Sequence, residues 1–143
     1  MVTRYMLDTN ACIALIKSRP EAMRIRFSGL STDEVGVSSI VAAELWYGVA
    51  LSQRKRQNEI ALRDFLDYAV VLDWPSAASR IYGQIRAGLK RKGTPIGAMD
   101  LLIAAHALFL DAVLVTQGSG DDDLALHGNG GLHVILPDFS IHP

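Results

Sequence analysis

The sequence has little cysteine, no long hydrophobic run and no excess of charge of either sign. Its single cysteine, Cys12, cannot form an internal disulfide and excludes a site built from several thiolates. The most apolar run, residues 101–110, has ten residues, against the ~18 that a membrane-spanning helix needs. The first ten residues lack the basic-then-apolar order of a signal peptide. We therefore expect a protein of the cytoplasm.

The overall composition is that of a folded domain. The chain has 143 residues, of which 50% are hydrophobic and 20% charged, and its net charge is −1. This length corresponds to about one domain of ~100–200 residues. A net charge near zero excludes a surface that is basic all over, so any contact with nucleic acid must use a local patch.

Short apolar or β-branched runs alternate with helical stripes along the chain. We expect strands at 5–7, 35–38, 70–72, 113–115 and 134–136. We expect helices at 11–17, 21–27, 40–51, 54–68, 75–93 and 98–110, a loop at 29–33, and no regular pattern in the Gly- and Asp-rich segment 117–131. This alternation predicts an α/β fold with crossover connections and a mainly parallel sheet. Ligands of such sheets bind at the carboxyl ends of the strands, where Asp8 and Thr116 fall.

Three acidic residues stand among apolar neighbours: Asp8, Glu44 and Asp100. A carboxylate in such surroundings is costly unless it is paired, hydrogen-bonded or bound to a metal. Simpler explanations exist for each of them. Asp8 can cap the helix that follows, Asp100 can favour the dipole of a helix first turn, and Glu44 can lie on an exposed helix surface.

If the side chains of these three acids lie close together in the folded protein, they suit only a few kinds of chemistry. Clustered carboxylates raise one another's pKa, and a divalent cation relieves the repulsion. Oxygen ligands favour Mg²⁺, with Mn²⁺ as a substitute, over zinc. Such a metal activates water and orients a phosphate, which predicts hydrolysis of a phosphodiester.

Three sequence blocks carry a resemblance to a known family. They are Met6-Leu7-Asp8-Thr9-Asn10, the stretch from Ser38 to Gly48 around Glu44, and the stretch from Gly83 through Asp100 to Ala107. In this order, and on this α/β pattern, the chain resembles the PIN-domain ribonucleases, and within them the VapC toxins of bacterial toxin–antitoxin pairs. The resemblance covers residues 1 to about 116.

The resemblance implies a single PIN domain over residues 1–143. Its expected fold has three layers, with a mainly parallel sheet of four to five short strands flanked by helices. Its expected activity is that of an Mg²⁺-dependent endoribonuclease acting on tRNA or a similar structured RNA. A cognate DNA-binding antitoxin of the VapB kind would neutralise it, and the toxin would form a homodimer.

The resemblance also implies roles for individual residues. Asp8, Glu44 and Asp100 match the catalytic, metal-binding acids of the family. The polar residues expected to support them are Thr9, Asn10, Ser39 and Thr116. The family's fourth acidic position has no clean counterpart in this sequence. Asp121 is the candidate for it, together with Asp122 and Asp123. The alternative is that these three residues form a solvated acidic loop.

Other polar and aromatic residues allow two interpretations. Arg86 is the candidate for a contact with the RNA backbone, although a basic run is usually a solvated surface. We expect His106 to be a buried, hydrogen-bonded histidine and not a ligand or base. Trp46 and Tyr47 either belong to the core or line a groove that receives an antitoxin helix.

Two other functions compete with the nuclease. The altered segment 117–124 is compatible with a catalytically weak PIN module that acts mainly as the partner of a DNA-binding antitoxin in a repressor complex. A metal-dependent phosphatase built on Asp8 would need a second acid two residues later, and that position is Asn10.

Overall fold

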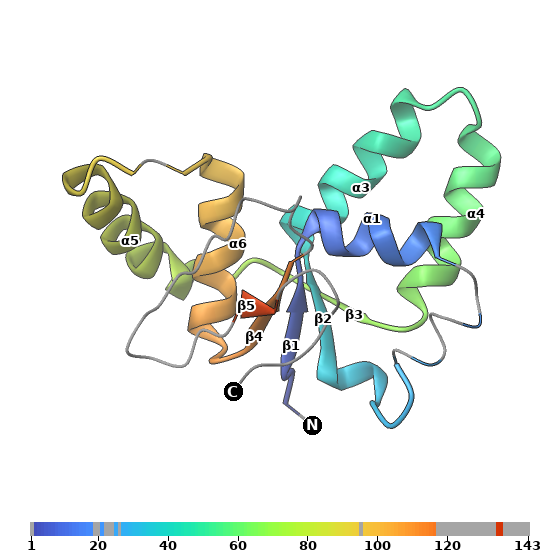
Figure 1. The fold of residues 1–143 in the computed structure, drawn as a ribbon, viewed down its shortest axis with the longest axis horizontal. Helices are drawn as coiled ribbons and strands as arrows, with labels where there is room; N and C mark the ends of the chain where they lie inside the picture. Colours follow the sequence, from blue (N-terminus) through green and yellow to red (C-terminus); the bar gives the residue numbers. More distant parts are fainter. Residues whose placement is uncertain are drawn as a thin grey trace.

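A parallel sheet forms the centre of the molecule. The computed structural model describes residues 2–18, 21, 25, 27–94, 96–116 and 134–135. In this part of the chain five parallel strands pair in the order β3-β2-β1-β4-β5 (Figure 1). The strands are β1 (Tyr5–Leu7), β2 (Val35–Ser38), β3 (Val70–Leu72), β4 (Val113–Val115) and β5 (Val134–Ile135). The predicted α/β class, the parallel sheet and its strand number are confirmed.

The helices follow the predicted stripes to within a few residues. They are α1 (Thr9–Lys17), α3 (Ser39–Leu51), α4 (Lys55–Leu66), α5 (Ser79–Arg91) and α6 (Ala98–Phe109). Two short 3₁₀ turns, η1 (Thr32–Glu34) and η2 (Ser76–Ala78), were not predicted. The first overlaps the expected loop 29–33, where the Glu34 N–H donates to the Ser31 carbonyl at 3.0 Å. Most of the expected helix 21–27 and all of segment 117–131 lie outside the described residues.

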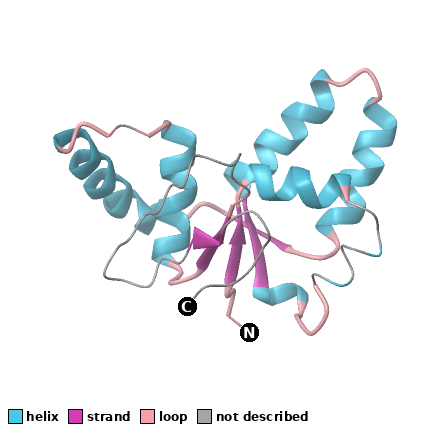
Figure 2. Ribbon diagram, viewed as in Figure 1, coloured by secondary structure: helices cyan, strands magenta, loops and turns pink. Residues whose placement is uncertain are grey.

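The helices form a layer on each side of the sheet. Helices α1, α3 and α4 lie on one side and contact one another, while α5 and α6 form a pair on the other side (Figures 1 and 2). The three-layer arrangement is therefore the one predicted. The two helical layers leave the carboxyl ends of the strands between them.

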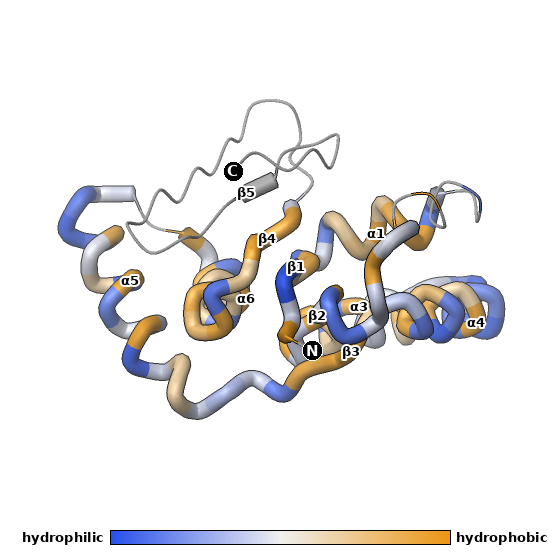
Figure 3. Tube along the Cα trace, turned by 90° about the horizontal axis from the view of Figure 1, so that it is seen from below, coloured by the Kyte–Doolittle hydropathy of each residue, from blue (hydrophilic) through white to orange (hydrophobic). Residues whose placement is uncertain are grey.

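Helix α6 accounts for the most apolar run of the sequence. Its buried residues are Leu101, Ile103, Ala104, Ala105, His106 and Ala107. It packs against β4, α3 and α5, so nearly its whole circumference is covered by protein, as expected for a helix that is apolar all round. Figure 3 shows β4 and α6 as neighbouring apolar segments. Among the described helices, none has the length and apolar character required to cross a membrane.

The strand register brings distant polar residues to one edge of the sheet. Leu7 of β1 is aligned with Val37 of β2 on one side and with Val115 of β4 on the other. The residues that follow these three positions are Asp8, Ser38 and Thr116. Because the strands are parallel, all three come to the same carboxyl edge, which is where α/β sheets bind ligands.

Candidate metal-binding active site

Asp8 connects the end of β1 to the start of α1. Its Oδ1 accepts a hydrogen bond from the Ala11 N–H at 2.7 Å and caps α1. Its backbone N–H donates to the Val115 carbonyl at 3.0 Å, which attaches it to β4. The capping role considered from the sequence is therefore real. It fixes one carboxylate oxygen and leaves the other available for a further ligand.

The electrostatic surroundings of Asp8 show that the three acids lie close to one another. Burial raises the pKa of Asp8 above 3.8, hydrogen bonds from Thr116 and Ala11 lower it, and the charges of Asp100 and Glu44 raise it again. The net direction is upward. The charges of Glu44 on α3 and Asp100 on α6 therefore reach Asp8 at the carboxyl edge of the sheet.

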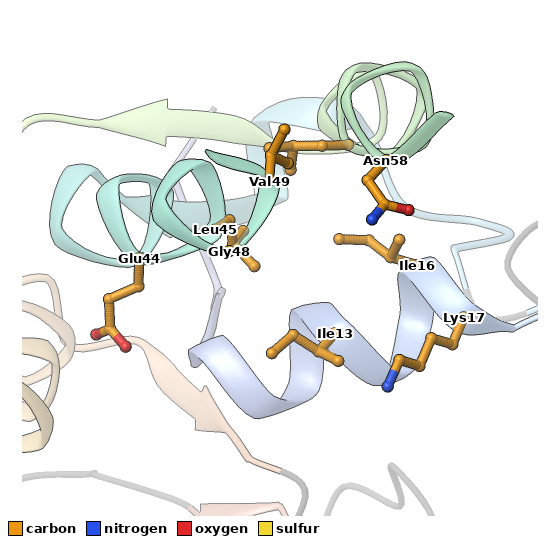
Figure 4. Close-up of a pocket in the computed structure, with 9 residues that line it drawn as sticks. Ile13, Ile16, Lys17, Glu44, Leu45, Gly48, Val49 and Asn58 are labelled. Atoms are coloured by element: carbon orange, nitrogen blue, oxygen red, sulfur yellow. The ribbon is translucent and has the colours of Figure 1, made fainter. Parts of the chain in front are cut away.

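Glu44 lies on α3 and is half-buried. It lines a cavity of about 360 Å³ between α1, α3 and α4. Figure 4 shows Glu44 at one end of this cavity and Asn58 at the other. The exposed surface position considered for Glu44 is not what the structure shows, because its side chain is partly covered and is near Asp8.

Asp100 is exposed in the first turn of α6. Its Oδ2 lies 3.7 Å from the position that a Cβ atom would occupy on Gly97, so the carboxylate is near the N-terminal end of its own helix, where the dipole favours negative charge. In the part of the chain that the structure describes, no three acidic, histidine or cysteine side chains are arranged to hold a metal ion. The charges of Glu44 and Asp100 reach Asp8, but the three carboxylates are not placed so that they could bind one metal ion.

The expected supporting residues have different environments. Thr116 lies close enough to Asp8 to lower the pKa of that carboxyl. The Ser39 Oγ accepts the Trp74 backbone N–H at 3.0 Å. The Thr9 Oγ1 is buried and has no hydrogen-bond partner, and Asn10 is exposed. The candidates for a fourth acid, Asp121, Asp122 and Asp123, lie outside the described residues.

His106 and Ser38 form a buried polar pair behind this edge. His106 is 1% exposed and Ser38 is 0% exposed, and the His106 Nδ1 lies 3.0 Å from the Ser38 Oγ. Burial lowers the pKa of His106, which keeps the ring neutral. The expectation of a buried, hydrogen-bonded histidine is confirmed.

The cavity between α1, α3 and α4 has mainly apolar walls. Its lining residues are Ile13, Ile16, Lys17, Glu44, Leu45, Gly48, Val49, Asn58 and Leu62. Trp46 packs against the core, whereas Tyr47 is 65% exposed, and neither lines this cavity. The sequence did not decide between a core position and a groove position for Trp46 and Tyr47. An apolar stripe on a helix does not indicate which other element packs against it.

Helix α5 carries the basic residues of the other helical layer. It contains Arg80, Arg86, Lys90 and Arg91 and no acid. Arg86 is exposed, and its Nη1 donates to the Tyr82 hydroxyl at 2.9 Å. Its guanidinium lies 5.9 Å from the centre of the Tyr82 ring. The side chain is thereby ordered while remaining accessible.

Comparison with known proteins now identifies the class. The family model of the PIN domain matches residues 5–125. The tRNA(fMet)-specific endonuclease VapC of Salmonella typhimurium is 44% identical over 114 residues, which cover 80% of this chain and 86% of the relative. Ribonuclease VapC2 of Rickettsia felis is 42% identical over 114 residues, covering 79% and 85%.

Solved structures agree with these relatives. The crystal structure of DNA-bound VapBC from Salmonella typhimurium has a chain that matches with a TM-score of 0.79 and 38% identity, covering 94% of this chain and 98% of that one. The present chain belongs to the PIN-domain family, in its VapC group.

Proposed function

We propose that this chain is an Mg²⁺-dependent endoribonuclease toxin, with Mn²⁺ as a substitute metal, that hydrolyses phosphodiester bonds of tRNA or a similar structured RNA. The observation that carries the proposal is the environment of Asp8. This buried carboxylate lies at the carboxyl edge of the sheet within the electrostatic reach of Glu44 and Asp100. The names of the VapC relatives, endonuclease and ribonuclease, support the same activity.

The residues present fit a hard divalent cation. The ion pairs in the described part of the chain, Arg4–Glu34 and Arg63–Glu59, do not involve the three acids. Within the described residues, no lysine or arginine side chain therefore forms an ion pair with these three carboxylates. Carboxylate oxygens, with the unpartnered Thr9 hydroxyl close by in sequence, favour Mg²⁺ or Mn²⁺ over zinc.

The catalytic roles follow from the chemistry of these side chains. A bound cation supplies an activated water and neutralises charge on a phosphate oxygen. Asp8, Glu44 and Asp100 would hold the cation, and the Thr116 hydroxyl and the Ala11 N–H orient the Asp8 carboxylate. The proposed source of a fourth acid is Asp121, Asp122 or Asp123. His106 is too deeply buried to exchange a proton with substrate.

Helix α5 is the proposed contact for the RNA backbone. It offers exposed cations and contains no acid of its own, and Arg86 is held by Tyr82. A protein with a net charge of −1 needs such a local patch to approach polyphosphate. The name of the Salmonella relative specifies tRNA, which supports tRNA as the substrate class.

The partner we propose is a cognate DNA-binding antitoxin of the VapB kind. The Salmonella neighbour is a VapBC complex bound to DNA. The apolar cavity between α1, α3 and α4 fits an apolar antitoxin segment, and Glu44 in its wall would place that segment beside the acids. A homodimer in the cytoplasm completes the proposal, with residues 1–143 as one PIN domain.

Incubation of the purified chain with total tRNA tests the activity. We expect cleavage with Mg²⁺ or Mn²⁺ and none with EDTA. The rate of cleavage should fall at least about a hundredfold in Asp8→Asn, Glu44→Gln and Asp100→Asn. Removal of an outer or inner partner of a metal typically costs ~10–100-fold or more in activity. Glu59→Gln removes a carboxylate from the Arg63 pair on α4 and should cleave normally. If no RNA is cleaved with any metal, the chain is a binding module of a repressor complex.

A further inference from the structure

Trp74 connects two helices that the sequence keeps far apart. It lies just beyond β3, and its backbone N–H donates to the Ser39 Oγ at 3.0 Å. Its indole Nε1–H donates to the Leu102 carbonyl at 2.8 Å. Ser39 is the first residue of α3, and Leu102 lies in the N-terminal half of α6. The backbone of Trp74 therefore bonds to α3, which carries Glu44, and its side chain bonds to α6, which carries Asp100.

A second connection lies one helical turn further along α6. The buried His106 Nδ1 is 3.0 Å from the Ser38 Oγ at the N-cap of α3. The Ser38 Oγ already accepts the Ile40 N–H at 3.2 Å, so its hydroxyl proton is available for the neutral imidazole. The two connections, Trp74–Leu102 and Ser38–His106, are spaced four residues apart on α6 and so lie on one face of that helix.

These connections are close to the acids that they would position. At a rise of about 1.5 Å per residue, Asp100 is about 3 Å along the axis from Leu102, and Glu44 is about 7.5 Å along the axis from Ser39. Apolar packing between helices is non-directional and permits small sliding movements. Hydrogen bonds fix a distance and a direction, and ligand distances in metal sites are set to within about 0.2 Å.

We infer that Trp74 and His106 are positioning residues, which set the separation of α3 from α6 and so bring Glu44 and Asp100 to one cation beside Asp8. This inference rests on the proposed function. Neither residue touches the metal. Trp74 acts through Leu102 and Ser39, and His106 acts through Ser38.

The Trp74→Phe variant tests the first connection, because it removes the indole N–H and keeps most of the ring. We expect Mn²⁺ binding, measured by the electron paramagnetic resonance signal of free Mn²⁺, to weaken roughly three- to tenfold, the range for the loss of one hydrogen bond. RNA cleavage should fall at low Mn²⁺ and recover at saturating Mn²⁺. A purely structural role would not produce this recovery.

Trp46→Phe is the matched control, since these are the two tryptophans of the chain. Trp46 is on α3, packs against the core and lies 5.4 Å under the Arg63 guanidinium. Within the described residues it makes no hydrogen bond to α6. Its replacement should lower the melting temperature comparably without changing Mn²⁺ affinity.

His106 variants test the second connection and keep the inference testable if Trp74→Phe does not fold. His106→Leu removes the ring nitrogen that pairs with the Ser38 Oγ, and His106→Asn replaces it with an amide group near the position of Nδ1. We expect weaker Mn²⁺ binding in His106→Leu and partial restoration in His106→Asn. If wild type binds Mn²⁺ and both the Trp74→Phe and the His106→Leu variant bind it equally well, the positioning role is wrong. If wild type binds no Mn²⁺, or Asp100→Asn binds it as well as wild type, the proposed function itself is wrong.

Discussion

Replacing Asp8 by Asn should stabilise the metal-free protein while removing its proposed activity. The Asn side chain keeps a carbonyl oxygen that accepts from the Ala11 N–H. It removes a charge that burial, Asp100 and Glu44 all disfavour. Relief of such a functional strain typically gives about 0.5–2 kcal/mol, which corresponds to a rise in melting temperature of roughly 2–4 °C per kcal/mol for a domain of this size.

Asp8→Ala separates the charge from the hydrogen bonds. Alanine also removes the charge, but it loses the helix cap, worth about 1 kcal/mol. Calorimetry of the metal-free proteins should therefore place Asp8→Asn above Asp8→Ala by about 1 kcal/mol. The difference between the two variants measures the cap that the Asp8 side chain gives to α1.

The stabilisation by Asp8→Asn should depend on pH with a defined sign. The folded-state pKa of Asp8 is raised above 3.8, so the protonated form favours the fold, and that contribution is lost as the pH rises through the folded-state pKa. The variant's advantage should be largest at pH 7 and disappear as the pH approaches 4. Equal stability of the two metal-free proteins at pH 7 would refute the reasoning.

Divalent metal should reverse the order of stability. A ligand that binds only the folded state, present at one hundred times its Kd, adds about 2.7 kcal/mol to the free energy of unfolding. This is the effect expected of Mn²⁺ at that concentration. Wild type should then melt about 5–11 °C higher than without metal, whereas Asp8→Asn should not respond. Differential scanning calorimetry with and without Mn²⁺ measures both effects.

Three further predictions follow from other residues. Gly36→Ala should lower the free energy of unfolding in urea by about 1–3 kcal/mol through overpacking, because its Cβ would lie 2.7 Å from the Met6 Sδ. Gly88→Ala has open space around its Cβ and should be neutral or stabilising. Burial, followed by the charge of Asp8, raises the pKa of the Cys12 thiol, so a disulfide reagent should label it only in urea. Arg86→Ala should weaken RNA binding and reduce its salt dependence by about one phosphate contact, whereas Arg63→Ala on α4 should not, as fluorescence anisotropy would show.

Much of the fold could be read from local sequence patterns. Short apolar or β-branched runs gave the positions of all five strands, and the apolar stripes gave α3, α4 and α6, because the period of hydrophobic residues depends on neighbours a few positions away. The 3₁₀ turn at Thr32–Glu34 carries no such period and was expected as loop. Ser38 caps α3, while the neighbouring Ser39 accepts from the Trp74 backbone N–H.

Trp74 is the site-related residue that sequence reasoning missed. Its indole donates to a carbonyl 28 positions further along the chain, and no local pattern indicates such a partner. A single polar aromatic residue directly after a strand end is a weak signal for it. The position of the Asp100 carboxylate near Gly97 could not be predicted either, since a side-chain rotamer depends on the charges around it.

The sequence by itself determined the class of fold and pointed to the three acids of the proposed site. Asp8, Glu44 and Asp100 were identifiable because carboxylates among apolar residues are costly, and the parallel sheet because strands and helices alternate. The tertiary structure alone decided how these parts meet. The parallel register puts Asp8, Ser38 and Thr116 at one edge, and hydrogen bonds from Trp74 and His106 join α3 to α6. Such contacts link residues tens of positions apart, so their energies depend on the assembled fold and leave no period in the sequence.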